Sequence, residues 1–140
     1  MSPLPTVGGD NGSWGTVLNA YLQTEHNADG THKTSINTVA TSGAAQNLSF
    51  NYDCHNITLS ENCTFTFTDL PASGVLDGML VKVTQGGSGG FTKAFPSSVL
   101  WPDGGTEPVM TPTTAGAISQ YVIIWDGTSL SGVLRGDNFV

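Results

Sequence analysis

Hydrophobic residues follow two different periods along the chain, one near the N-terminus and one over most of the remainder. Between residues 13 and 25, apolar positions recur every three or four residues, which places them on one stripe of an α-helix. These positions are Trp14, Val17, Leu18, Tyr21 and Leu22. The pattern predicts a short helix that begins near Trp14. Because a helix of about 11 residues is marginal in isolation, we expect its apolar stripe to need a partner surface.

From residue 48 onward, apolar and polar residues alternate with a period of two, as in β-strands with one buried face. The alternating segments cover residues 48–52, 57–59, 63–67 and 79–83. Residues 91–95 and 99–101 are separated by Pro96, which has no amide hydrogen to donate and so predicts an edge strand or a bulge. The glycine-rich stretch 85–90 is predicted to join two strands of a hairpin.

The most apolar run, residues 119–125, is predicted to be a central strand that is buried on both faces. The Asp126-Gly127 pair after it is a hairpin-turn signal, so residues 130–134 are expected to return as its partner. Seven or eight short strands at this spacing indicate a β-sandwich or jelly roll. We therefore expect a mainly β protein: a single β-sandwich or jelly-roll-like domain preceded by an extended arm and one short N-terminal α-helix.

Proline, glycine and small polar residues divide the chain before the alternating pattern begins. Residues 1–12 contain Pro3, Pro5 and three glycines, and are predicted to form an extended arm. Residues 34–46 are small and polar and are predicted to be a linker. Since the composition changes near residue 46, we place the boundary within Ser42–Gln46. The predicted organisation is an attachment or trimerisation segment over residues 1–45 and a β-sandwich domain over residues 46–140.

Composition and charge limit the possible partners. The few charged residues (11%) and 18 glycines suit many short strands and turns. The formal net charge is −7, and the four basic residues are dispersed: Lys33, Lys82, Lys93 and Arg135. Nucleic acids and anionic membranes require a basic patch, so we expect neither as a partner. The N-terminus lacks a secretory signal, and in a reducing cytoplasm Cys54 and Cys63 are expected to be free thiols.

The sequence contains no arrangement of residues typical of a catalytic or metal site. The histidines lie in turn or strand contexts without a nucleophile placed against them, and most aspartates adjoin turn residues. His26, Asp29 and His32 are close enough in sequence to meet on a metal ion, but hydrogen bonding within a polar turn explains them better. We therefore predict no catalytic residue, no metal, no cofactor and no enzymatic activity.

One aromatic residue is a candidate for binding a sugar ring. Most aromatic side chains of a small β-domain belong to its core, and we expect this of Trp125 in particular. Trp101 lies at the margin of the long loop 102–117 and is the best candidate for exposure. Asp103, in the Asp-Gly pair that follows it, is the second residue that we expect to face a ligand.

Several short motifs lie close together between Leu4 and Lys33. They are Gly8-Gly9-Asp10, Trp14-Gly15-Thr16, Leu18-Asn19, Leu22, Glu25-His26-Asn27 and Asp29-Gly30-Thr31-His32. This segment resembles one near the N-terminus of many virion proteins of tailed bacteriophages, of the tail-fibre, head-fibre and capsid-decoration kind. The remainder resembles, more loosely, the small β-domains of such proteins, through residues 59–67, 101–117 and 136–139.

The resemblance implies a non-enzymatic, trimeric component of the virion surface, assembled in the host cytoplasm, and it transfers no catalytic residue. We expect a small capsid cement (decoration) or short-fibre protein. In this hypothesis the N-terminal arm and helix attach the chain to the virion while the β-domain projects. The apolar stripe of residues 14–22 packs either against other copies in the trimer or against a neighbouring major capsid or tail protein. The alternative hypothesis is a carbohydrate-binding module that recognises a host surface glycan through the loops around Trp101 and Asp103.

Overall fold

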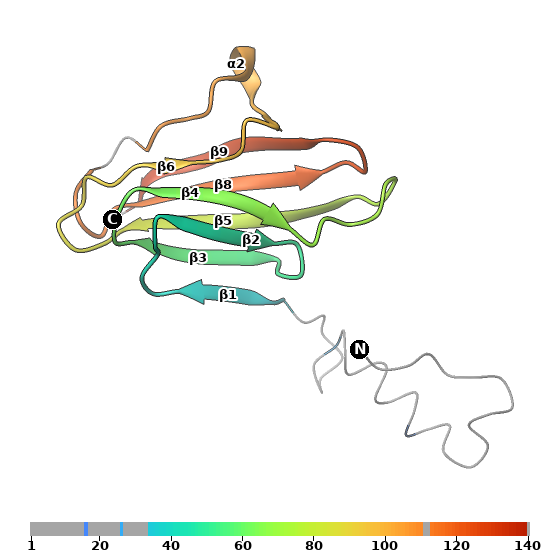
Figure 1. Cartoon of the computed structure of the whole chain (residues 1–140), viewed down its shortest axis with the longest axis horizontal. Helices are drawn as coiled ribbons and strands as arrows, with labels where there is room; N and C mark the ends of the chain where they lie inside the picture. The colour runs from blue at the N-terminus through green and yellow to red at the C-terminus, as the bar shows by residue number, and fades with distance from the viewer. Residues whose placement is uncertain (1–15, 17–25, 27–33, 111–112, 140) are drawn as a thin grey trace, which may run out of the picture. The chain divides into compact units, whose positions relative to one another are not determined.

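The computed structural model describes residues 34–110 and 113–139, together with Thr16 and His26. The chain divides into two units, Met1–Thr34 and Ser35–Val140, and the strands described below all belong to the second. This second unit is mainly β (Figure 1). The predicted N-terminal helix lies outside the described residues apart from Thr16, which is helical.

The β unit contains two sheets that lie face to face (Figure 1). In chain order, its elements are β1 (Ile36–Val39), β2 (Ala45–Ser49), β3 (Cys54–Leu59), β4 (Cys63–Thr68), β5 (Asp77–Gln85), β6 (Lys93–Ala94), β7 (Val99–Leu100), the helical turn α2 (Pro102–Gly105), β8 (Ile118–Trp125) and β9 (Leu130–Phe139). The larger sheet has the strand order β1-β3-β5-β8-β9-β7, and the smaller sheet has the order β2-β4-β6.

The first six strands alternate between the two sheets. β1, β3 and β5 pair in parallel in the larger sheet, and β2, β4 and β6 pair in parallel in the smaller one. The chain therefore winds through both sheets three times, as in the coils of a β-solenoid. A jelly roll is built from antiparallel strands, so that part of the prediction is wrong. The stretch 85–90 leads from one sheet to the other and does not close a hairpin, which corrects a second prediction.

The hairpin predicted at Asp126-Gly127 is confirmed, because β8 and β9 pair in antiparallel fashion on either side of it. Asp126 Oδ1 accepts hydrogen bonds from the backbone amides of Thr128 (2.8 Å) and Ser129 (2.7 Å). β8 also pairs with β5, which makes it a central strand of the larger sheet. Its second face is not buried, however, since Ile124 is 38% exposed. The prediction that this strand is buried on both faces is therefore wrong for the single chain.

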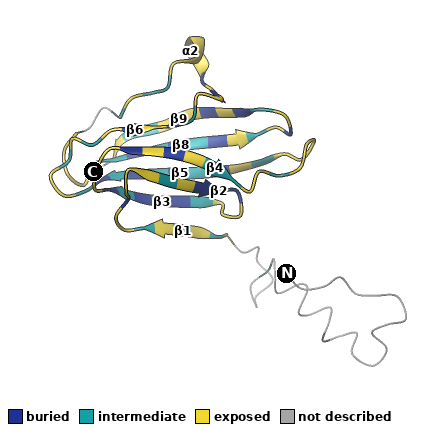
Figure 2. Cartoon of the chain, viewed as in Figure 1, coloured by how far each residue is buried: buried dark blue, intermediate teal, exposed yellow. Residues whose placement is uncertain are grey.

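The hydrophobic core lies between the two sheets, and buried positions alternate with less buried ones along β4, β5 and β8 (Figure 2). At the centre of the core is Phe95, directly after β6. Its ring centroid lies 5.1 Å from that of Phe65, 5.4 Å from that of Trp101 and 5.2 Å from that of Tyr121. Each fully buried side chain of this size contributes roughly 1.5–3 kcal/mol. This aromatic cluster therefore joins the smaller sheet to the larger one.

The β unit begins earlier than the sequence predicts. Residues 34–46, expected to be a linker, contain β1 and the start of β2. β1 pairs with β3 from Ile36–Cys54 to Val39–Ile57, and the Ser42 amide donates to the Thr58 carbonyl at 2.8 Å. The boundary between the two units follows Thr34, so the predicted position within Ser42–Gln46 is wrong. An edge strand that buries few side chains has little hydrophobic pattern by which to recognise it.

Two local predictions describe the structure well. Pro96 separates β6, at the edge of the smaller sheet, from β7, at the edge of the larger one, as a residue without an amide hydrogen requires. Cys63 is buried, Cys54 is half-buried, and both are free thiols.

Among the described residues, no helix is long and apolar enough to cross a membrane.

Candidate functional site

The residues predicted to carry function lie in different parts of the chain, and the structure describes only some of them. The anchoring residues Trp14, Val17, Leu18, Tyr21 and Leu22 lie outside the described residues. Asp103 belongs to the α2 turn on the loop after β7. Trp101 is only 7% exposed and packs against the rings of Phe95 and Tyr121. The prediction that Trp101 is exposed is therefore wrong, and the side chain of Asp103 lies outside the described part of the structure.

Trp101 is buried because the opposing strand leaves space for its ring. The pairing of β7 with β9 places Leu100 beside Ser131, one residue before Gly132. A Cβ atom at Gly132 would lie 2.6 Å from Cζ3 of the Trp101 indole, which is closer than real Cβ contacts. The glycine therefore allows the indole to lie against the backbone of β9. This glycine is the sequence signal for the burial of Trp101, but the strand pairing is needed to recognise it.

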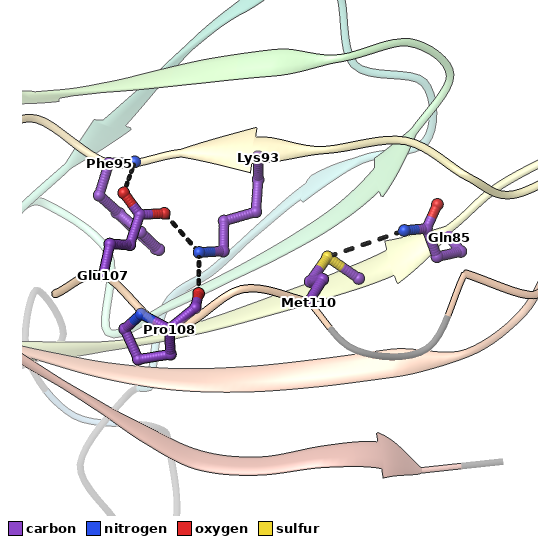
Figure 3. A network of polar contacts seen from close by, with 6 residues as sticks. All are labelled: Gln85, Lys93, Phe95, Glu107, Pro108 and Met110. Carbon is purple, nitrogen blue, oxygen red and sulfur yellow. Dashed lines mark hydrogen bonds and ion pairs between the residues drawn. The ribbon is translucent and has the colours of Figure 1, made fainter.

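A buried ion pair connects β6 to the loop after α2 (Figure 3). Lys93 Nζ donates to Glu107 Oε1 and, at 2.6 Å, to the Pro108 carbonyl. Glu107 Oε2 accepts the backbone amide of Phe95 at 3.0 Å. We call Lys93, Glu107 and the Pro108 carbonyl the loop clamp, since these three hydrogen bonds hold the loop against the edge of the smaller sheet.

The loop clamp has a strongly asymmetric environment. The Lys93 side chain is 1% exposed, whereas that of Glu107 is 26% exposed, so water reaches the carboxylate but not the ammonium group. Lys93 Nζ lies 5.1 Å from the ring centroid of Phe95 and 4.6 Å from that of Tyr121, within the range of cation–π contacts. Burial lowers the pKa of Lys93, and the hydrogen bond and charge of Glu107 only partly oppose this. Burial also raises the pKa of Tyr121.

Two further buried polar groups hold connecting segments in the same region. Gln85 Nε2 donates to the Phe91 carbonyl at 2.7 Å, and Gln85 Oε1 accepts the Phe91 amide at 3.0 Å. Gln85 therefore binds both backbone polar groups of Phe91 and closes the glycine-rich stretch 86–90. Its side-chain amide also lies near the sulfur of Met110 (Figure 3). In the same larger sheet, Ser119 of β8 donates to Asp137 and joins β8 to β9. These side chains stabilise the fold.

His55 performs a similar task in the first coil. Its side chain is fully buried, and Nε2 lies 2.9 Å from the Ser49 carbonyl oxygen. Because a carbonyl only accepts, Nε2 carries the hydrogen, and Nδ1 accepts from the Asn37 amide group at 3.2 Å. Neutral His55 thus holds β1 and the end of β2 to β3. Burial lowers the pKa of His55, with the hydrogen bond to Ser49 opposing the shift.

The described residues include no group of three or more His, Cys, Asp or Glu side chains that could hold a metal ion. Asp29 and His32, weighed as metal ligands with His26, lie outside the described residues. Ser88 lies within Gly86-Gly87-Ser88-Gly89-Gly90, which has the spacing of a nucleophile elbow. A nucleophile elbow leads directly into a helix, whereas the next element here is β6. The glycine–serine spacing around Ser88 therefore does not occur in the structural context of a nucleophile elbow.

The outer face of the larger sheet carries a row of apolar side chains. Strand pairing aligns five positions across β1, β3, β5, β8 and β9: Ile36, Cys54, Leu80, Val122 and Val133. Ile36 and Val133 are 55% and 46% exposed. Beside the middle of this row, two residues along β5 and β8 from the Leu80–Val122 pair, is a shallow depression lined by Leu76, Asp77, Gly78 and Ile124. We call these aligned residues the outer apolar row.

A polar row follows the outer apolar row on the same face. It aligns Thr38, Asn56, Lys82 and Gln120, and Arg135 Nη1 donates to Gln120 Oε1. Lys82 and Arg135 are the basic side chains described besides the buried Lys93. Neither the loop clamp nor the outer apolar row is among the features predicted from the sequence. A signal for the second was present, because residues 121–125 are apolar at inward and outward positions alike.

No family model matches the chain, and neither a curated protein nor a solved structure matches it. Its function is therefore argued from its own residues.

Proposed function

We propose that the chain is a non-enzymatic structural component of a bacteriophage virion, namely a small trimeric capsid cement (decoration) or short-fibre protein. The observation that carries the proposal is the division of the chain between Thr34 and Ser35. The second unit has its own two-sheet core. The segment that resembles those of phage virion proteins, Leu4 to Lys33, coincides with the first unit. An attachment segment separate from a self-contained domain suits a protein that binds a particle and projects from it.

The positions of the perturbed ionisable side chains also favour a structural role. Enzymes place such groups where a substrate can reach them. In this chain Lys93 and Tyr121 face one another inside the core, and the Lys93 side chain is 1% exposed. No substrate atom can contact Lys93 Nζ unless the loop clamp opens. The pKa shifts at these two residues are therefore explained by packing.

The main sugar-binding candidate of the carbohydrate-binding hypothesis, Trp101, is not exposed. A sugar-binding surface needs an exposed aromatic face, and Trp101 instead belongs to the core. Tyr52 is 39% exposed, but its ring lies edge-on to His55, with centroids 5.6 Å apart. We therefore retain the virion-component proposal alone.

The proposal can be tested by adding purified protein to phage particles that lack it. The full chain is expected to bind saturably and to co-sediment with the particles. A chain of residues 35–140 is expected to keep its β-type circular dichroism spectrum and to lose binding. The double variant Trp14→Ala/Leu18→Ala should behave like the truncation, with Val109→Ala, an exposed position of the β unit, as its matched control. Full binding by residues 35–140 would refute attachment through the N-terminal segment.

A further inference from the structure

The outer face of the larger sheet departs from the usual pattern of a sheet covered on one side. The inward residues of β8, Ser119, Tyr121 and Ile123, are fully buried. The outward residues of such a strand are normally polar, yet here Val122 and Ile124 are outward. The smaller sheet follows the rule, because its exposed outward positions include Asn47, Thr64 and Thr66. Exposed apolar side chains are thus concentrated on one of the two sheets.

The size of the outer apolar row suits a protein–protein contact. The row crosses five strands, which are about 4.8 Å apart, so it is about 19 Å long. Leu100 and Leu76, 59% and 75% exposed, enlarge the apolar surface beside Ile124 and Ser131. One side of a standard interface covers about 800 Å², which is wider than this row alone and includes a polar rim. The adjacent row with Lys82 and Arg135 supplies such a rim.

Charge indicates which partner fits this face. The whole chain carries a net charge of −7, whereas the charged side chains of the polar row are Lys82 and Arg135. Two carboxylates also lie near the outer apolar row: Asp77 lines the depression, and Asp53 precedes Cys54. Four carboxylates instead lie exposed in the turns between strands: Asp53, Glu61, Asp69 and Asp126. The polar row is therefore complementary in charge to these acidic turns on another copy of the chain. A contact of this face with itself would instead bring two cationic rows into one interface.

We propose that the outer face of the larger sheet binds a second copy of this chain, with the outer apolar row packed against a surface that carries acidic turns. A contact between unlike surfaces repeats from copy to copy and closes into a ring when the rotation permits, as in a trimer. The outward apolar residues of β8 become buried in this assembly, as the sequence pattern of residues 121–125 requires. This inference rests on the proposed function in one respect, the trimer.

Light scattering coupled to size-exclusion chromatography tests the assignment on the full chain. The wild type is expected to have the mass of a trimer. Val133→Asp places a carboxylate in the outer apolar row at a position already 46% exposed, so it should leave the core intact. Its mass is expected to fall to about one third, because the buried charge opens the interface. Thr66→Asp, at an exposed strand position of the smaller sheet, is the matched control and should remain trimeric.

Two further measurements keep the test decisive if Val133→Asp fails to fold. Arg135→Glu reverses an exposed charge beside the row and should dissociate the trimer into monomers, because the new carboxylate faces the acidic turns of the neighbouring copy. Cys54 lies within the row, so its alkylation by iodoacetamide should be slow in the wild-type trimer and fast in the Arg135→Glu monomer. Cys63, buried in the core, is the internal control.

The possible outcomes separate this inference from the proposed function. A trimer that persists in Val133→Asp and Arg135→Glu would overturn the surface and leave the trimeric virion component standing. Loss of particle binding by such a trimer would identify a virion protein as the occupant of the face, which also overturns the inference. A monomeric wild type would refute both the surface and the trimer. A wild-type trimer that binds no particle would refute the virion role alone.

Discussion

The loop clamp predicts an unequal response to removal of its two charges. Glu107→Ala deletes the carboxylate and leaves Lys93 Nζ, 1% exposed, with the Pro108 carbonyl and two aromatic rings as its remaining partners. Lys93→Met keeps an apolar stem of similar length against Phe95 and Tyr121. In that variant the Glu107 carboxylate, 26% exposed, still accepts the Phe95 amide and can be hydrated.

The expected magnitudes follow from this difference in exposure. Leaving a buried charge without its partner costs roughly 3–5 kcal/mol, so Glu107→Ala should lower the free energy of unfolding by about 3 kcal/mol. Loss of a hydrogen bond to a charged group whose other partner can reach water costs about 1–2 kcal/mol, which we expect for Lys93→Met. The double variant Lys93→Met/Glu107→Leu removes both charges. Its stability should lie within about 1 kcal/mol of the wild type, because apolar replacement of a buried pair is often neutral.

Urea unfolding followed by circular dichroism measures the stability of the wild type, the two single variants and the double variant. The midpoints should rank the wild type and the double variant highest, Lys93→Met next and Glu107→Ala lowest, at constant slope. Lys82→Met, a half-buried lysine on the outer face, is the control for loss of a positive charge and should change the midpoint little. Equal losses in the two single variants, or a larger loss in Lys93→Met, would refute the view that the unequal exposure of the pair sets its energetics.

His55 and Gly132 give two further predictions. His55 has a folded pKa below its ordinary value of 6.5, so the unfolded state binds the extra proton; the free energy of unfolding should fall as the pH is lowered through 6.5 and level off below the folded pKa. His55→Gln should flatten this dependence in urea titrations at a series of pH values, and an unchanged slope would exclude His55 as its origin. Gly132→Ala places a Cβ 2.6 Å from the Trp101 ring and should cost about 1–3 kcal/mol with an altered tryptophan fluorescence spectrum; a variant as stable as the wild type would contradict the close packing of Trp101.

The alternation of side chains predicts which residues are strands and which of their faces is inward, but not which strands are neighbours. Residues 63–67 and 79–83 alternate as expected and their inward residues form the core. The same alternation fits antiparallel and parallel pairing equally well, so the winding of β1 to β6 between two sheets is not predictable from it. From β1 to β6 the paired residues are 18 to 30 positions apart, as in Ile36–Cys54 and Cys63–Lys93. No local period records contacts at such separations.

The candidate site was harder to predict than the fold because its residues are buried by partners that are distant in the sequence. A lysine is usually exposed, and nothing near Lys93 in sequence identifies Glu107 as its partner across the turn α2. Trp101 beside a proline in a long loop is a reasonable candidate for exposure. Its burial depends on Gly132, which comes next to it only through the pairing of β7 with β9.

The buried polar side chains compensate for strands that are too short to hold the coils by themselves. β6 has two residues and pairs with β4 only at Cys63–Lys93 and Thr64–Ala94. The loop clamp and the paired hydrogen bonds of Gln85 add side-chain bonds in this third coil.

In the first coil, where β1 has four residues, His55 bonds to Asn37 of β1 and to the Ser49 carbonyl of β2. Polar groups inside the core thus fix the positions of the coils, and the outer face of the larger sheet remains available for a neighbouring molecule. The proposed role on a particle requires both properties, because a neighbour can only pack against an outer apolar row whose strands keep their register.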